Sequence, residues 1–95
     1  MSAYFIVDVD VQKPAEMREY LEKVPDTLKP YGGRYIVRGG KFEVMEGNWQ
    51  PTRVVMLEFP SMEQAKRWYE CEEYAPYKQT RLDSCATDMV LVEGI

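Results

Sequence analysis

The stretch that most constrains this chain runs from Tyr31 to Phe59 and predicts one long β-hairpin. Gly47-Asn48 is a turn pair between segments rich in strand-forming residues, which is typical of a two-residue hairpin loop. Gly39-Gly40 interrupts the first arm, and a glycine pair inside a strand indicates a β-bulge or a bend. The stretch therefore predicts two neighbouring strands of an antiparallel sheet.

The segment before the hairpin predicts a strand followed by a helix. Residues 3–11 alternate weakly and are rich in strand formers, so we expect a first strand there. A helix then opens at Pro14, and Pro25 inside it predicts a kink. The apolar stripe of this helix consists of Met17, Tyr20, Leu21, Val24 and Leu28.

The segment after the hairpin predicts two helices and a last strand. Ser61 and Gln64 match the capping box, which satisfies two backbone donors at a helix N-terminus. We expect Pro76 to stop this helix, a third helix over 77–84 and a strand over 88–93. The β-α-β-β-α-β order predicts an α+β, ferredoxin-like fold, with both main helices on one face of an antiparallel sheet.

Both faces of the predicted sheet carry apolar side chains. In the second hairpin arm, Val55 and Leu57 point one way, whereas Val54 and Met56 point the other. The helices cover one face only, and a chain of 95 residues, taken as one domain over 1–95, has nothing left for the other. An exposed apolar face is an association site, so a homodimer is predicted.

Composition excludes several classes of function. A net charge of −4 argues against a nucleic-acid partner, and no apolar run is long enough for a membrane span, so we expect a cytoplasmic protein. The chain has no histidine, which excludes Ser-His-Asp and Cys-His catalysis and a haem held by a proximal histidine. Cys71 and Cys85 lack metal-ligand spacing and are expected to be reduced thiols, so no metal or cofactor is predicted.

Arg34, Arg38 and Glu58 form the first candidate site. The two arginines lie four residues apart in a strand and are expected to share a face. A bulge at Gly39-Gly40 would set Ile36 opposite Glu58. Both arginines would then lie diagonally across from Glu58 on the same face. The cluster either binds an anionic substrate such as a carboxylate, or forms an ion-pair network that satisfies Glu58.

Two further groups are candidate ligand-binding residues. Trp49 and Arg53 share one face of the second hairpin arm and either line a pocket rim or pack across the strands. Tyr69, Tyr74 and Arg81 lie where the second helix gives way to the third. A phenol near an arginine can act as a general acid or orient a substrate, although such tyrosines are more often core residues with one hydrogen bond.

The segments YGGRYIVRGG, EVMEGNW-P-R and VVMLEFPS, with the late Arg81, resemble domain-of-unknown-function family 1330. That family is similar to the dimeric α+β barrel superfamily, in which two ferredoxin-like chains join their sheets into one barrel. The superfamily includes cofactor-independent monooxygenases, muconolactone isomerases and haem-handling enzymes. The resemblance implies a dimeric α+β barrel, while the absence of histidine argues against a haem role.

Residues and resemblance together predict a homodimer that binds a small metabolite between sheet and helices, with an anionic metabolite as one option. As an enzyme it would be a cofactor-free isomerase or monooxygenase, using Tyr or Glu as acid or base and Arg34 or Arg38 to stabilise an anionic intermediate. The alternative is a non-catalytic ligand-binding or regulatory dimer with the same pocket. A purely structural dimer would have no pocket.

Overall fold

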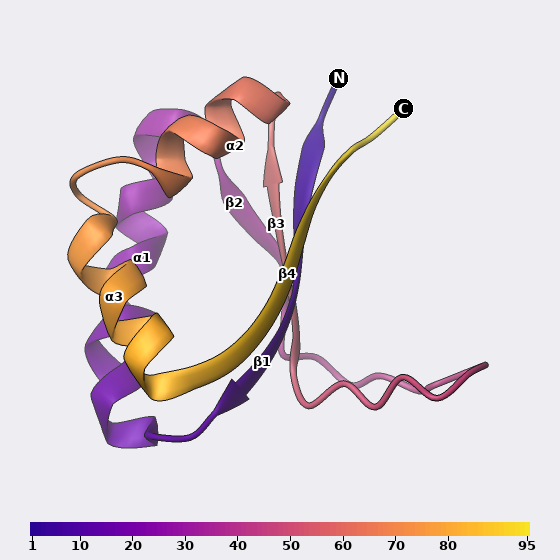
Figure 1. Cartoon of the computed structure of the whole chain (residues 1–95). Helices are drawn as coiled ribbons and strands as arrows, with labels where there is room; N and C mark the ends of the chain where they lie inside the picture. The colour runs from indigo at the N-terminus through magenta and orange to yellow at the C-terminus, as the bar shows by residue number, and fades with distance from the viewer.

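The computed structural model describes all residues from 1 to 95 and contains a four-stranded antiparallel sheet with its helices on one face (Figure 1). The strands lie in the order β2-β3-β1-β4, with bounds β1 Ala3–Val11, β2 Arg34–Arg38, β3 Val54–Phe59 and β4 Cys85–Glu93. The helices are α1 Arg18–Leu28, α2 Met62–Tyr69 and α3 Ala75–Ser84, with short 3₁₀ turns at Pro14–Met17 and Lys29–Tyr31. The predicted α+β, ferredoxin-like arrangement is confirmed.

Two boundaries near the C-terminus differ from the sequence prediction. Pro76 does not stop the second helix, because α2 already ends at Tyr69. Pro76 instead lies in the first turn of α3, where the backbone N–H groups have no intrahelical acceptor and proline, which lacks one, is tolerated. The last strand starts at Cys85 rather than Asp88. It can start this early because β4 pairs with β1 along the whole length of both strands.

β1 alternates between the two faces of the sheet as predicted. Phe5, Val7 and Val9 are buried on the face that the helices cover, here called the inner face. Tyr4 and Ile6 are only half-buried and lie on the opposite, outer face. This strand lies between β3 and β4, so it contributes to both surfaces of the sheet.

The buried side of α1 is narrower than the predicted stripe. Tyr20, Val24 and Leu28 are buried, whereas Leu21 is 42% exposed. Pro25 lies inside the helix, as predicted. Because proline has no N–H, the Leu21 carbonyl loses its usual helical donor at this position.

Trp68 of α2 lies at the centre of the core. Its ring stacks on Tyr74 with 4.0 Å between centroids and meets Phe5 edge-on, and its Nε1 donates to Thr27 Oγ1 at 3.0 Å. Burying an indole with its N–H satisfied is strongly stabilising. Trp68 thereby connects α1, the sheet and the start of α3.

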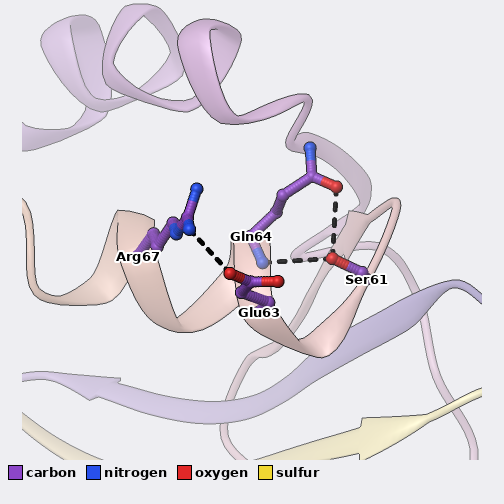
Figure 2. Close-up of polar contacts among 4 residues, drawn as sticks. All are labelled: Ser61, Glu63, Gln64 and Arg67. Atoms are coloured by element: carbon purple, nitrogen blue, oxygen red, sulfur yellow. Dashed lines mark hydrogen bonds and ion pairs between the residues drawn. The ribbon is translucent and has the colours of Figure 1, made fainter.

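Ser61 caps α2, although the predicted capping box is only half formed (Figure 2). The Ser61 hydroxyl oxygen accepts from the Gln64 backbone N–H at 3.1 Å, and the hydroxyl donates to Gln64 Oε1 at 3.1 Å. Gln64 Nε2 donates to the Tyr31 carbonyl at 3.2 Å, so the side chain does not return to the Ser61 N–H. Glu63 and Arg67 form an ion pair at 2.6 Å one turn apart on the same helix.

The predicted long hairpin is paired only at its base, and this part of the prediction is wrong. Residues 39–53 form no strand, and most of this segment extends away from the sheet as an arm (Figure 1). Gly47-Asn48 is therefore not a two-residue hairpin loop. The apolar side chains of the arm are exposed, and a two-stranded ribbon without a packed face is only marginally stable. These side chains are Phe42, Val44, Met45 and Trp49.

The outer face of the sheet carries an apolar row that crosses all four strands. The strand registers place Val37 beside Met56, Met56 beside Ile6 and Ile6 beside Val90. Val90 is 55% exposed, and no helix of this chain covers the row. The predicted apolar outer face is therefore present.

Two further observations concern the chain as a whole. No helix combines the length and the apolar character that a membrane crossing requires. Cys71 and Cys85 are both buried and free, as expected for reduced thiols.

We expect Ser61→Ala to lower the free energy of unfolding by about 1 kcal/mol, because α2 loses its only side-chain N-cap. Ser61→Asp keeps an acceptor at the same position and should lose less. Urea titration of the three proteins measures the difference. Equal losses in both variants would show that the Ser61 hydroxyl proton, rather than the cap, is what matters.

Candidate functional site

A cavity of about 290 Å³ lies between the inner face of the sheet and the helices. Of its 16 lining residues 12 are hydrophobic, which is the lining expected of a small-molecule site. The apolar walls come mainly from the inner-face side chains of β1 and β3, together with Met17, Trp68 and Met89. The lining residues that carry a hydroxyl or a guanidinium group are Tyr20, Tyr35, Tyr74, Arg38, Arg53 and Arg81.

Three of these residues form one connected cluster, here called the Tyr20–Tyr74–Arg81 cluster. The Tyr20 and Tyr74 hydroxyls are hydrogen-bonded at 2.8 Å, and Arg81 Nε donates to the Tyr74 hydroxyl oxygen at 3.3 Å. Tyr74 precedes α3 and Arg81 follows it by seven residues, so both lie on one side of the helix. Tyr20 reaches them from the buried side of α1.

The cluster has more donors than acceptors within the chain. Arg81 is only 4% exposed, and its Nη2 is buried without any hydrogen-bond partner. A phenol carries one hydrogen, so whichever tyrosine donates in the Tyr20–Tyr74 bond, the hydrogen of the other finds no acceptor in the protein. Buried donors normally have partners, which makes this surplus unusual.

The surroundings raise the pKa of two members of the cluster, Tyr20 and Arg81. Desolvation, followed by the proximity of Tyr74, raises the pKa of the Tyr20 phenol far above its usual value, so Tyr20 stays neutral. Desolvation alone lowers the pKa of Arg81, but the phenols of Tyr74, Tyr20 and Tyr69 outweigh it and the net pKa is raised. Arg81 is therefore a permanent cation, and it lies near the neutral phenol of Tyr20.

Arg38 lies at the exposed edge of the cavity, where its position depends on Pro25. Arg38 Nη2 donates at 2.7 Å to the Leu21 carbonyl, the acceptor that Pro25 leaves without a helical donor. The Arg38 guanidinium also stacks over the Tyr35 ring, 4.5 Å from its centroid. Burial raises the pKa of the Tyr35 phenol, although Arg38 and Arg53 oppose this effect.

The expected cluster of Arg34, Arg38 and Glu58 does not form. The irregularity in β2 lies between Tyr35 and Val37 rather than at Gly39-Gly40, so Arg34 pairs opposite Glu58 on the outer face and Arg38 turns inward. Arg34 and Glu58 form an ion pair at 2.7 Å. The hydrogen bond from Arg34 lowers the pKa of the Glu58 carboxyl, in spite of its partial desolvation.

The remaining predicted residues divide between the cavity and the surface. Arg53 lines the cavity together with Arg38, Tyr74 and Arg81. Trp49 is 60% exposed on the arm. Tyr69 packs against the core and lies under Lys78 Nζ, 4.3 Å from the ring centroid, but it does not line the cavity.

Tyr20 and Tyr35 are cavity residues that were not among the predicted site residues. Tyr20 was predicted only as part of the apolar stripe of the first helix. The sequence feature that could have identified Tyr20 as a site residue is its phenol. A buried hydroxyl needs a hydrogen-bond partner, so a tyrosine on a core stripe implies a polar group nearby. For Tyr35 the inward orientation follows from strand alternation, but the bulge beside it hides the alternation in the sequence.

Comparison with known proteins places the chain among proteins of the same fold. A family model described as Domain of unknown function (DUF1330) matches residues 2–95. A protein of unknown function from Rhodopseudomonas palustris aligns with a TM-score of 0.78 at 11% identity, covering 99% of this chain and 82% of that one. SnoaB, a cofactor-independent oxygenase from Streptomyces nogalater, aligns with a TM-score of 0.71 at 12% identity, covering 99% and 93%. None of the curated proteins matches the sequence.

Replacing Pro25 with alanine should release Arg38, because the new residue brings a backbone N–H that competes for the Leu21 carbonyl. We expect the free energy of unfolding to change by about 1 kcal/mol or less, since the restored helical bond offsets the lost one. Arg38→Met should cost about 1 kcal/mol in the wild type and clearly less in the Pro25→Ala background.

A double-mutant cycle in urea measures this coupling between Pro25 and Arg38. Arg34→Met is the matched control, because Arg34 lies on the same strand but points to the outer face. An equal cost of Arg38→Met in both backgrounds would contradict the role assigned to Pro25.

Proposed function

We propose that this protein, which belongs to the DUF1330 family, binds one small organic molecule in the cavity between its sheet and its helices. The observation that carries the proposal is the cavity itself, which is apolar over most of its lining and has a few polar groups that converge from different elements. Its volume of about 290 Å³ exceeds the roughly 150 Å³ of an engineered cavity known to hold benzene. The cavity therefore suits a molecule of one or two rings.

The composition of the lining favours binding over side-chain catalysis. It contains no Asp, Glu, Lys or Cys, and the chain has no histidine, so the usual general bases are absent from the cavity. Burial raises the pKa of Tyr20 and of Tyr35, so both phenols stay protonated and offer no phenolate to accept a proton. A ligand-binding or regulatory role is what this lining supports best.

A cofactor-free enzyme is the second candidate, and the Tyr20–Tyr74–Arg81 cluster favours it. Neutral phenols and a guanidinium are the donors that stabilise an enolate or a similar anionic intermediate. The structural likeness to SnoaB, described as a cofactor-independent oxygenase, is a likeness of fold. In this version the substrate would have to be acidic itself and would lose its proton to water, because the cavity lining offers no base.

The binding unit in this proposal is a homodimer formed through the outer face. What supports it is the apolar row Val37–Met56–Ile6–Val90, which this chain leaves uncovered. A two-fold axis brings the same patch of both copies together, so one apolar row can cover its own counterpart. The exposed apolar side chains of the arm add to the surface available for the second copy.

Titration with 2-naphthamide, a neutral two-ring probe, tests the binding proposal. We expect calorimetry to show saturable binding to the wild type and no binding to Val55→Phe. Val55 lines the cavity, and the phenyl ring of the variant would fill it. Leu82→Phe is the control, because Leu82 is exposed on α3 and does not line the cavity. Equal binding to both variants, or a wild type that binds neither 2-naphthamide nor its charged analogue 2-naphthoate, would contradict the proposal.

Light scattering at micromolar concentration tests the dimer. We expect a mass of twice the 11.1 kDa of the chain for the wild type and a shift to monomer for Val90→Arg. Leu82→Arg is the control, because Leu82 on α3 is 54% exposed, almost the same as the 55% of Val90. A wild type that is a stable folded monomer would exclude the dimer.

A further inference from the structure

We infer that the ligand of the proposed cavity is an organic carboxylate with an apolar, ring-sized body, and that Arg81 binds its anionic end. The inference rests on the proposed function and adds the chemical class of the ligand. It assigns different tasks to the two parts of the lining, since the Tyr20–Tyr74–Arg81 cluster holds the charge and the valine-rich strands hold the body.

The first observation is that Arg81 is a buried cation without a counter-ion in its own chain. None of the three ion pairs of the structure involves Arg81, and no carboxylate lines the cavity that it faces. A buried charge is costly unless it is paired and hydrogen-bonded. A ligand carboxylate is the group that would complete this arrangement.

The second observation is the surplus of donors in the cluster. Arg81 Nη2 has no partner, and one phenolic hydrogen of the Tyr20–Tyr74 pair has no acceptor. An ionised carboxylate offers only acceptors and can take bonds from a guanidinium and a hydroxyl together. A neutral amide would bring its own N–H donors to a site that already has too many.

The third observation is the sign of the charge around the cavity. The whole chain has a net charge of −4, yet the charged residues of the lining are three arginines, Arg38, Arg53 and Arg81. A cavity lined by one sign of charge with apolar walls attracts ligands of the opposite sign. This distribution runs against the overall charge of the protein, which is why it points to the ligand.

The burial of Arg81 has an alternative explanation, in which its only role is to position Tyr74 through their hydrogen bond. That bond uses only Nε and leaves Nη2 without a protein acceptor. If positioning Tyr74 were the whole task of Arg81, removing its charge should weaken the fold and leave ligand preference unchanged. The experiment below therefore measures both stability and the preference for a charged ligand.

The test compares 2-naphthoate with 2-naphthamide, which have the same rings and differ in charge. We expect the wild type to bind the acid roughly ten- to a hundredfold more tightly than the amide. This ratio is the gain in affinity that a hydrogen bond to a charged group typically brings. Arg81→Met should bring the two affinities together, and Arg81→Lys should restore part of the preference. Arg67→Met is the control, because Arg67 is paired with Glu63 on the exposed side of α2.

A second variant and a melting curve cover the case in which Arg81→Met folds poorly. Tyr20→Phe removes one hydroxyl from the cluster and should lower the acid-to-amide ratio severalfold with Arg81 intact. The Arg81→Met protein without ligand should melt no lower than the wild type, because an unpaired buried charge is removed.

The outcomes separate the two proposals. Equal affinities of the wild type for acid and amide, or a preference that survives in Arg81→Met, overturn the carboxylate inference and leave ligand binding in place. Failure of the wild type to bind either probe overturns both. Loss of acid binding in Arg67→Met to the same extent as in Arg81→Met would also overturn the inference, since the effect would then be one of net charge.

Discussion

The hydrogen bond between the Tyr20 and Tyr74 hydroxyls is the contact on which the rest of the structure depends. It joins α1 to the start of α3 above the inner face, and Arg81 holds Tyr74 from the side of α3. The two rings also meet edge to face, with 6.1 Å between their centroids. Protein cores normally leave no void as large as the cavity that Tyr20, Tyr74 and Arg81 line.

Two arginines of the cavity differ in how the chain satisfies them, and the difference separates structure from function. Arg38 has a carbonyl acceptor that Pro25 frees and an aromatic ring to stack on, so its needs are met within the chain. Arg81 is far more deeply buried and has a single phenol oxygen. Arg81 is therefore the more costly of the two to leave unpaired, and its Nη2 has no partner within the chain.

Features that depend on neighbouring residues in the sequence were predicted correctly. Features that depend on which segment a strand pairs with were missed. The alternation of β1 and the cap at Ser61 are written in neighbouring residues, and both are found. Residues 39–53 were predicted to be paired strands because they are rich in strand-forming residues. Such a ribbon needs a packed face, which the chain does not supply, and no strand forms there. Arg81 was named as a candidate next to Tyr74, but the unpaired nitrogen that distinguishes it appears only in three dimensions.

The bulge between Tyr35 and Val37 shows how one strand serves both faces of the sheet. In a regular strand Arg34 and Arg38 would share a face, because they are four residues apart. One extra residue reverses the alternation, so Arg34 pairs with Glu58 outside while Arg38 reaches the cavity inside. Without the bulge Arg38 would lie on the outer face and would not line the cavity. The bulge thus lets β2 place one arginine on each face of the sheet.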